Sequence, residues 1–134
     1  MYLLDTNICI YLIKKRPEIL LKKFRSYPIS MFRVSAVTIA ELYYGVSKSE
    51  RKKTNADALI QFLAPFEFVS FTDADAIAYG EIRAKLERKG QVIGPYDLQI
   101  AAQAISRKMT LVTNNSREFQ RVPGLACENW VPSG

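Results

Sequence analysis

The feature of this sequence that most constrains its fold is a regular alternation of short apolar runs with longer segments of helical periodicity. Short apolar runs bounded by polar residues are typical of buried strands, whereas apolar residues three or four apart are typical of helices packed on a core. Strands separated by helices predict a parallel sheet covered by helices on both faces. The chain has 134 residues, a usual size for one domain, so we predict a single α/β domain over residues 1–134.

The individual elements follow from this alternation and from the prolines and glycines that interrupt it. Strands are predicted at residues 2–5, 31–36, 66–71, 110–113 and 126–131. Helices are predicted at residues 7–15, 18–26, 37–49, 51–66, 72–89 and 94–108, with a turn or short helix at 116–122. The clearest helix is 72–89, where apolar residues recur at Ala74, Ala78, Ile82 and Leu86. Either Ser35 or Thr38 can cap the helix at 37–49.

The composition excludes several kinds of chemistry. There is no histidine, which removes Ser-His and Cys-His nucleophile pairs, an imidazole general base and His-ligated zinc. Cys9 and Cys127 lack metal-ligand spacing, so we expect reduced thiols. The formal net charge of +6 favours polyanionic partners. No apolar run is long enough to span a membrane and no signal segment is recognisable, so we expect a cytoplasmic protein without a membrane partner.

Asp5 directly follows the apolar run that opens the chain, and two interpretations of it compete. In the first, Asp5 only caps the helix that follows, because its carboxylate accepts hydrogen bonds from free N–H groups at a helix start. In the second, Asp5 lies at the carboxyl end of a central strand, where open α/β sheets place their ligands. Other acids at the same place would favour the second interpretation.

Two further acids occupy positions where apolar residues are expected. Asp97 begins the apolar stripe of the helix at 94–108, so its carboxylate should point inward. Glu41 lies among apolar and aromatic neighbours, with no basic residue between Arg33 and Lys48 to pair with it locally. Burying three such acids suggests that they share one partner.

Most of the other acids have ordinary explanations. Thr72 and Asp75 have the spacing of a capping box, and Asp73 adds negative charge to the same first helical turn. Further acids lie beside basic residues or in polar stretches, and we interpret them as surface charges: Glu18, Glu50, Asp57, Glu81 and Glu87.

Carboxylates that lie close together cannot all ionise unless a cation neutralises them. Oxygen ligands without histidine or cysteine select hard ions, so Asp5, Glu41 and Asp97 predict a site for Mg²⁺ or Mn²⁺. Such an ion can polarise a phosphodiester, lower the pKa of a bound water and stabilise a leaving oxygen. The three acids therefore predict metal-dependent hydrolysis without histidine.

Four segments occur in order along the chain: LLDTNICIYLI, SAVTIAELYYGV, IGPYDLQIAAQAI and LVTNNSREFQRVPGLACENW. Together they resemble the PIN-domain ribonucleases, and most closely the VapC toxins of type II toxin-antitoxin modules, over the whole chain. The resemblance implies a flavodoxin-like parallel sheet, an acidic Mg²⁺ or Mn²⁺ site and endonucleolytic cleavage of RNA, often tRNA. It also implies inhibition of translation and growth, a homodimer, and neutralisation by a cognate VapB antitoxin.

The resemblance places the first three acids of the family at Asp5, Glu41 and Asp97, with Asp5 and Asp97 as metal ligands. The small polar residues that support the first acid fall on Thr6 and Asn7. The hydroxyl near the fourth position of the site falls on Thr113.

The fourth acid is where this sequence departs from the broader PIN pattern. Many relatives have an aspartate one or two residues after the threonine of the last site strand, but here Asn114 and Asn115 follow Thr113. Asn115 could align a water through its amide, and Glu118 could reach the metal from the next turn. Both alternatives remain open, as does the presence of a second metal.

Surface contacts are less strongly indicated. Lys14, Lys15, Arg16 and Arg117 flank the predicted strand ends, where they could hold an RNA backbone or form a solvated surface. The stretches ICIYLI and LYYGV carry more apolar side chains than one helix face needs. They could form a contact surface for a partner or belong to the core.

Two other functions are alternatives to a ribonuclease. A receiver or a haloacid-type phosphatase shares the sheet and a strand-end aspartate, but Asn7 occupies the place of the second phosphatase aspartate and the chain has no adjacent acid pair. An inactive RNA-binding module that retains the fold is the second alternative. Metal dependence of RNA cleavage would separate that module from an enzyme.

Overall fold

A computed structural model describes residues 1–132 and has a five-stranded sheet whose strands all run parallel. The strands are β1 (Tyr2–Leu4), β2 (Phe32–Ser35), β3 (Glu67–Val69), β4 (Thr110–Val112) and β5 (Cys127–Glu128). The helices are α1 (Thr6–Lys14), α2 (Glu18–Arg25), α3 (Ala36–Ser47), α4 (Lys52–Leu63), α5 (Asp73–Arg88), α6 (Pro95–Ser106) and α7 (Ser116–Phe119), with a 3₁₀ turn η1 (Ile29–Met31) before β2. The predicted α/β class and parallel sheet are confirmed.

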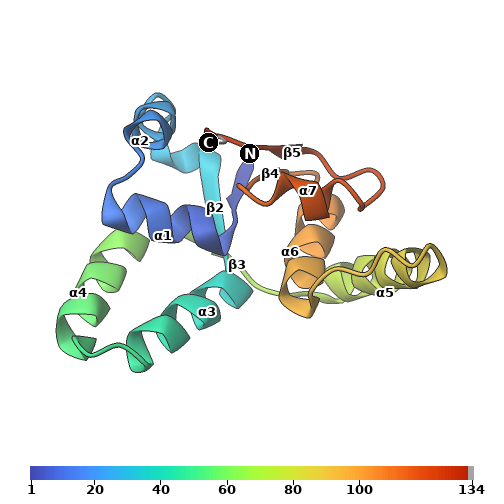
Figure 1. Ribbon diagram of the computed structural model, residues 1–134, viewed down its shortest axis with the longest axis horizontal. Helices are drawn as coiled ribbons and strands as arrows, with labels where there is room; N and C mark the ends of the chain where they lie inside the picture. Colours follow the sequence, from blue (N-terminus) through green and yellow to red (C-terminus); the bar gives the residue numbers. More distant parts are fainter. Residues whose placement is uncertain (133–134) are drawn as a thin grey trace.

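The strand order is β3-β2-β1-β4-β5, which puts β1 at the centre of the sheet. From β1 the chain proceeds outward through β2 and β3, and it then crosses to β4 and β5 on the other side (Figure 1). The direction of winding therefore reverses between β1 and β4. In open α/β sheets, the carboxyl ends of the strands at such a reversal form a crevice for ligands.

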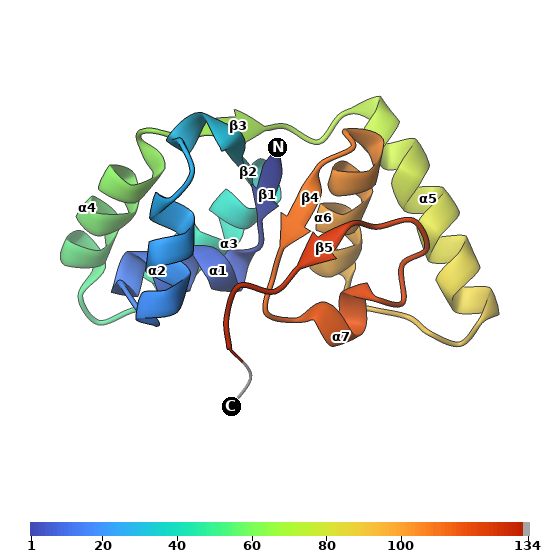
Figure 2. The same ribbon diagram turned by 90° about the horizontal axis from the view of Figure 1, so that it is seen from above.

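Helices cover both faces of the sheet, as Figure 2 shows: α1 to α4 lie on one side, and α5 and α6 on the other. Successive side chains of a strand point to opposite faces, so Leu4 packs with the first group and Leu3 with the second. The first core cluster also contains the buried side chains of Ile8, Leu20, Phe32, Leu42 and Leu59. The second contains those of Ile82, Leu86, Ile100, Leu111 and Phe119.

Several helices begin where the sequence predicts. Asp5 caps α1, because its Oδ1 accepts a hydrogen bond of 2.8 Å from the Thr6 N–H. Ser35, and not Thr38, caps α3 by accepting a 3.0 Å bond from the Val37 N–H. Thr72 and Asp75 form the predicted capping box of α5, and Pro95 occupies the first turn of α6. The strand ends at Asp5 and Ser35 are thus also helix starts.

The last strand is shorter than predicted, because the chain leaves the sheet after Glu128. The ring of Trp130 then packs against Tyr2, Tyr27 and Phe32, with centroids 5.0, 5.5 and 6.0 Å apart. Aromatic burial at the base of β1 therefore replaces strand pairing. The strand predicted at 66–71 is likewise reduced to Glu67–Val69, at the edge of the sheet.

Cys9 and Cys127 are both free thiols, as predicted. Within residues 1–132, no helix has the length and apolar character needed to cross a membrane.

Candidate active site

Asp5 lies at the carboxyl end of the central strand, next to the reversal of winding between β1 and β4. Its side chain is only 4% exposed, yet the described structure gives it no basic partner. Its Oδ1 accepts from the Thr6 N–H, and its Oδ2 accepts a 2.8 Å bond from the Thr113 hydroxyl at the end of β4. Both interpretations of Asp5 are therefore correct at the structural level: it caps α1 and it lies at the strand-end crevice.

Thr113 orients the Asp5 carboxylate through two successive hydrogen bonds. Its hydroxyl has one proton, which it donates to Asp5, and its oxygen accepts a 2.9 Å bond from the Asn115 N–H. Thr113 is fully buried, so water does not compete for these bonds. The loop after β4 thus orients the acid at the end of β1.

Asp97 and Glu41 approach Asp5 from two helices. Asp97 lies in the first turn of α6, and Glu41 lies in the middle of α3. Together with Asp5 they line a cavity of about 230 Å³, whose wall also includes Thr6, Asn7, Val37, Tyr96, Ile100 and Asn115. The structure therefore brings the three predicted acids and three of the predicted supporting residues to one cavity.

The pKa values of two acids in the cavity, Asp5 and Asp97, are raised. Burial raises the pKa of Asp5, and hydrogen bonds from Thr113 and Thr6 partly oppose this effect. Burial and the negative charge of Asp5 are the main reasons why the pKa of Asp97 is raised to about 7. Glu118, by hydrogen bonding and by charge, and the charge of Glu41 raise it further. Three other acids thus act on Asp97, and a cation bound among them would relieve this repulsion.

Glu118 and Asn115 form a pair at the rim of the cavity. Asn115 directly precedes the short helix α7, and its side-chain amide donates a 3.1 Å hydrogen bond to Oε2 of Glu118 in that helix. Glu118 also acts on Asp97 by hydrogen bonding and by charge, so its carboxylate lies beside the site, where Asn115 binds it.

Among residues 1–132, no group of three or more acidic or cysteine side chains is already arranged to hold a metal ion. The chemistry of the cavity nevertheless fits a hard cation, because its carboxylate oxygens have no basic partner and repel one another. Mg²⁺ commonly takes only one or two protein carboxylates and keeps several waters, so it does not need a complete protein cage.

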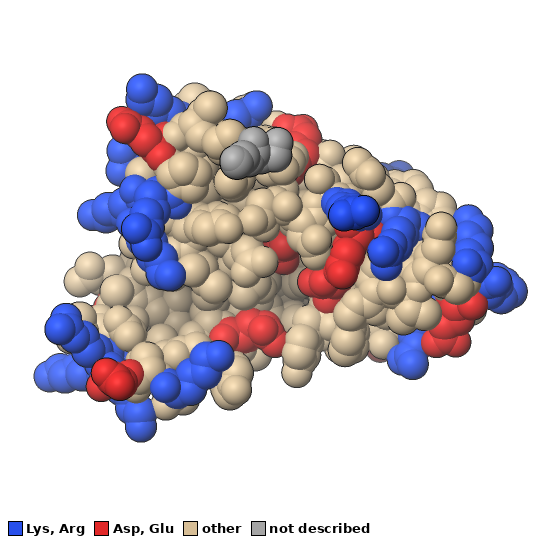
Figure 3. Space-filling model, viewed as in Figure 1, with Lys and Arg blue, Asp and Glu red and all other residues tan. Residues whose placement is uncertain are grey.

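The predicted basic residues lie around the acids rather than among them. All four are exposed, and Lys14 also lines a neighbouring groove that contains Glu41. In Figure 3 acidic side chains gather in and beside a hollow near the middle of the face, and basic side chains gather towards its edges. A negative site is therefore surrounded by positive charge, which suits a phosphate backbone that crosses the hollow.

Asp75 has a second role that the sequence does not indicate. Asp75 forms the predicted capping box, but it is also completely buried, because Ser106 and Arg107 at the end of α6 donate to its carboxylate. Ala74, the first member of the apolar series of this helix, is exposed. The buried side of α5 thus begins at Asp75, and only the tertiary contact with α6 reveals this.

The chain matches the PIN domain family over residues 2–125. It is 45% identical to Ribonuclease VapC2 of Rickettsia felis, over 96% of this chain and 97% of that protein. It is 42% identical to the tRNA(fMet)-specific endonuclease VapC of Salmonella typhimurium, again over 96% of this chain and 97% of that protein. The crystal structure of DNA-bound VapBC from Salmonella typhimurium contains a chain that superposes with a TM-score of 0.92 at 42% identity, covering 97% of this chain and 98% of that one. The chain therefore belongs to the PIN-domain family and, within it, to the VapC ribonucleases.

Proposed function

We propose that the acidic cavity binds a divalent metal ion and hydrolyses phosphodiester bonds within RNA, so that the protein arrests translation and growth as the toxin of a toxin-antitoxin pair. The observation that carries this proposal is the convergence of Asp5, Glu41 and Asp97 on one cavity. The raised pKa of Asp97, to which Asp5, Glu118 and Glu41 contribute, supports it. A site that crowds four carboxylates costs stability unless a cation neutralises it. Its relatives' activity as ribonucleases supports the same conclusion.

We assign Asp5 and Asp97 as the principal metal ligands, with Glu41 and Glu118 completing the acidic set. An all-oxygen site selects Mg²⁺ or Mn²⁺ over zinc and copper. When bound, such an ion supplies a water of lowered pKa and stabilises negative charge on the phosphate and the leaving oxygen. RNA cleavage that needs Mg²⁺ or Mn²⁺ and is lost in Asp5→Asn tests this assignment.

The other polar residues of the cavity hold the acids in place. Each carboxylate oxygen of Asp5 accepts one hydrogen bond, from the Thr6 N–H or from the Thr113 hydroxyl. The remaining lone pairs of these oxygens are free to bind a ligand in the cavity. Asn7 lines the cavity from the first turn of α1, where its amide can orient a water or a phosphate oxygen. The side-chain amide of Asn115 orients the carboxylate of Glu118 by donating a hydrogen bond to it.

We propose that the substrate is RNA, and that transfer RNA is the first class to examine, because one relative is named as a tRNA(fMet)-specific endonuclease. Lys14, Lys15, Arg16 and Arg117 would contact the backbone phosphates on either side of the cleaved bond. Each such contact releases counterions, so RNA binding should weaken as the salt concentration rises. We propose that the enzyme acts in the cytoplasm, where such RNA substrates occur.

The fourth position of the site can be assigned by metal titration. Because Glu118 faces Asp97 and is held by Asn115, we expect Glu118→Gln to raise the Mn²⁺ concentration for half-maximal cleavage about tenfold, whereas Asn115→Asp should not lower it. The measurement is the initial rate of RNA cleavage at a series of Mn²⁺ concentrations. A normal titration for Glu118→Gln, together with tighter metal binding in Asn115→Asp, would move the fourth position to Asn115.

An apolar groove beside the cavity suits the antitoxin. It encloses about 360 Å³ between α1, α3 and α4, and it is lined by Ile10, Ile13, Leu42, Val46 and Leu59. These side chains come largely from the ICIYLI and LYYGV stretches, whose surplus of apolar residues was noted above. Glu41 lines both the groove and the acidic cavity, so a VapB-type segment in the groove would reach the site. We propose that the antitoxin binds here and blocks RNA access.

A larger side chain at Gly45 should fill the groove without disturbing the fold of the protein. A Cβ at this position of α3 would meet no atom within 4 Å, and the glycine lines the groove. We therefore expect Gly45→Leu to fold and cleave RNA normally, but to need at least about tenfold more antitoxin for inhibition, because its side chain occupies the groove. The measurement is an antitoxin titration of RNA cleavage.

Gly80→Leu is the matched control for this experiment, because Gly80 is also helical and also has open space, but it lies on the exposed side of α5. Antitoxin should inhibit Gly80→Leu and the wild type equally. Equal inhibition of Gly45→Leu would show that the antitoxin binds elsewhere.

We also propose a homodimer. Tyr44 on α3 and Tyr96 on α6 are 63% and 58% exposed, and both line a hollow beside the acidic cavity. Exposed aromatic side chains of this kind are enriched in subunit interfaces.

A further inference from the structure

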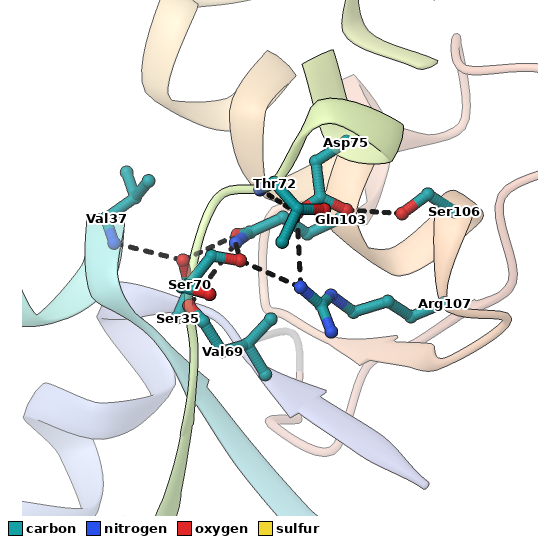
Figure 4. Close-up of polar contacts among 9 residues, drawn as sticks. All are labelled: Ser35, Val37, Val69, Ser70, Thr72, Asp75, Gln103, Ser106 and Arg107. Atoms are coloured by element: carbon teal, nitrogen blue, oxygen red, sulfur yellow. Dashed lines mark hydrogen bonds and ion pairs between the residues drawn. The ribbon is translucent and has the colours of Figure 1, made fainter. Parts of the chain in front are cut away.

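Gln103 is a polar residue in a completely buried position of α6. Its Oε1 accepts a 2.5 Å hydrogen bond from the Ser35 hydroxyl, and its Nε2 lies 3.2 Å from the Ser70 carbonyl oxygen and 3.4 Å from that of Val69 (Figure 4). Carbonyl oxygens only accept, so this arrangement satisfies both ends of the amide. Gln103 therefore joins three elements: α6, the end of β3 and the start of α3.

The Ser35 end of this contact controls the start of α3. Ser35 donates its one hydroxyl proton to Gln103, which leaves its lone pairs for the Val37 N–H at the first turn of the helix. A second link lies in the same turn, where the Thr6 hydroxyl donates to Thr38 at 3.2 Å. The first turn of α3 is thus tied to α6 on one side and to the start of α1 on the other.

The acids lie on the elements that these links connect. Glu41 is carried by α3, Asp97 is carried by the same helix as Gln103, and Asp5 directly precedes Thr6. Helices move as rigid bodies over such short lengths, so a contact that fixes α3 against α6 also fixes Glu41 against Asp97. Apolar contacts tolerate sliding, whereas a buried and fully satisfied hydrogen-bond network specifies one arrangement.

We propose that Gln103 is a positioning residue, which sets the placement of Glu41 relative to Asp97 by hydrogen-bonding the capping serine of α3. This inference rests on the proposed function, because it concerns the acidic site. Gln103 does not line the cavity, so it touches neither substrate nor metal and acts only through α3 and α6.

A purely stabilising role is the alternative, and the neighbouring network around Asp75 supplies the control. Asp75 binds Ser106 and Arg107 and so joins α5 to α6, but it makes no hydrogen bond to α3. Figure 4 shows the two networks side by side, with Ser70 accepting from both Gln103 and Arg107. A variant of Asp75 therefore lowers stability in the same region without releasing α3.

The test compares Gln103→Met with Asp75→Asn, below the unfolding temperature of each. Methionine has a similar size but makes no comparable hydrogen bond, so the Ser35 hydroxyl loses its partner. We expect Gln103→Met to bind Mn²⁺ about tenfold more weakly without RNA, by electron paramagnetic resonance of the free ion, and to lower kcat about tenfold with little change in KM. Hydrogen exchange of the Val37 N–H should accelerate. Asp75→Asn should lower the unfolding temperature but leave Mn²⁺ binding, kcat and Val37 exchange unchanged.

Ser35→Ala keeps the inference testable if Gln103→Met does not fold, since it removes the other partner of the same bond. It should reproduce the loss of Mn²⁺ binding and of kcat, and the double variant should be little worse than either single variant. Wild-type Mn²⁺ binding and kcat in Gln103→Met, or equal losses in Asp75→Asn, would overturn the positioning role. A wild-type protein without metal-dependent cleavage would instead overturn the proposed function.

Discussion

Replacing Asp97 with asparagine should reduce RNA cleavage at least about 100-fold while raising the stability of the metal-free protein. Loss of a group that merely supports a metal ligand commonly costs 10- to 100-fold, so loss of a ligand should cost at least as much. Asparagine keeps the shape of the side chain but removes the charge that Asp5, Glu118 and Glu41 repel. The measurements are the initial cleavage rate and the unfolding temperature of chelator-treated protein.

The stabilising effect of Asp97→Asn should increase as the pH rises. The pKa of Asp97 is about 7 in the folded protein, above the usual value of an unfolded aspartate, so folding favours its protonated form. The stability that this proton provides is complete below about pH 4 and is lost as the pH rises through 7. We therefore expect Asp97→Asn to exceed the metal-free wild type in unfolding temperature at pH 8, and to match it near pH 4.

Asp73→Asn is the control, because it makes the same change in an exposed acid of the first turn of α5. It should leave both cleavage and the pH dependence unchanged. Near wild-type cleavage by purified Asp97→Asn would show that Asp97 is not a ligand of the reacting site.

The largest expected loss of stability is that of Asp75→Asn. Asp75 is fully buried, accepts from Ser106 and forms a 3.3 Å ion pair with Arg107, whose side chain is 29% exposed. Removing one member of a buried pair costs about 3–5 kcal/mol, and the partial exposure of Arg107 reduces this to about 2–3 kcal/mol. For a chain of this length that corresponds to roughly 10 °C in unfolding temperature, which thermal denaturation can measure.

The effect of acid on this pair has the opposite sign to that on Asp97. Burial alone would raise the pKa of Asp75, but hydrogen bonds from Ser106 and Thr72 and the charge of Arg107 lower it overall. The contribution of this carboxylate to stability is therefore present above about pH 4 and is lost as the pH falls further. Asp75→Asn should be closest to the wild type in strong acid. An unfolding temperature within 2 °C of the wild type at pH 7 would contradict the estimate of about 2–3 kcal/mol.

Much of the fold and of the acid set could be predicted because both depend on local patterns. Periodicity located the strands and helices, and the position of Asp5 after an apolar run placed it at a strand end. Parallel strands bring their carboxyl ends to one edge, which is why Asp5 and Thr113 meet although 108 residues separate them. Asp97 was recognisable because it stands at the head of an apolar helix face.

The rest depends on contacts between elements that no local pattern specifies. Asp75 reads as a simple capping residue until α6 brings Ser106 and Arg107 against it. The contact between Ser35 and Gln103 spans 68 residues, and neither residue type indicates its partner. The strand order, and hence the crevice between β1 and β4, likewise depends on pairing between strands that are distant in the sequence.

Sequencing of RNA 5′ ends can show whether this acidic site cuts RNA, as we claim. Cells that express the wild-type protein without antitoxin would be compared with cells that express Asp5→Asn at the same level. We predict new 5′ ends at discrete positions, reproduced on purified RNA when Mg²⁺ or Mn²⁺ is added, and their complete absence with Asp5→Asn. The same ends with Asp5→Asn, or cleavage that persists in chelator, would contradict the claim.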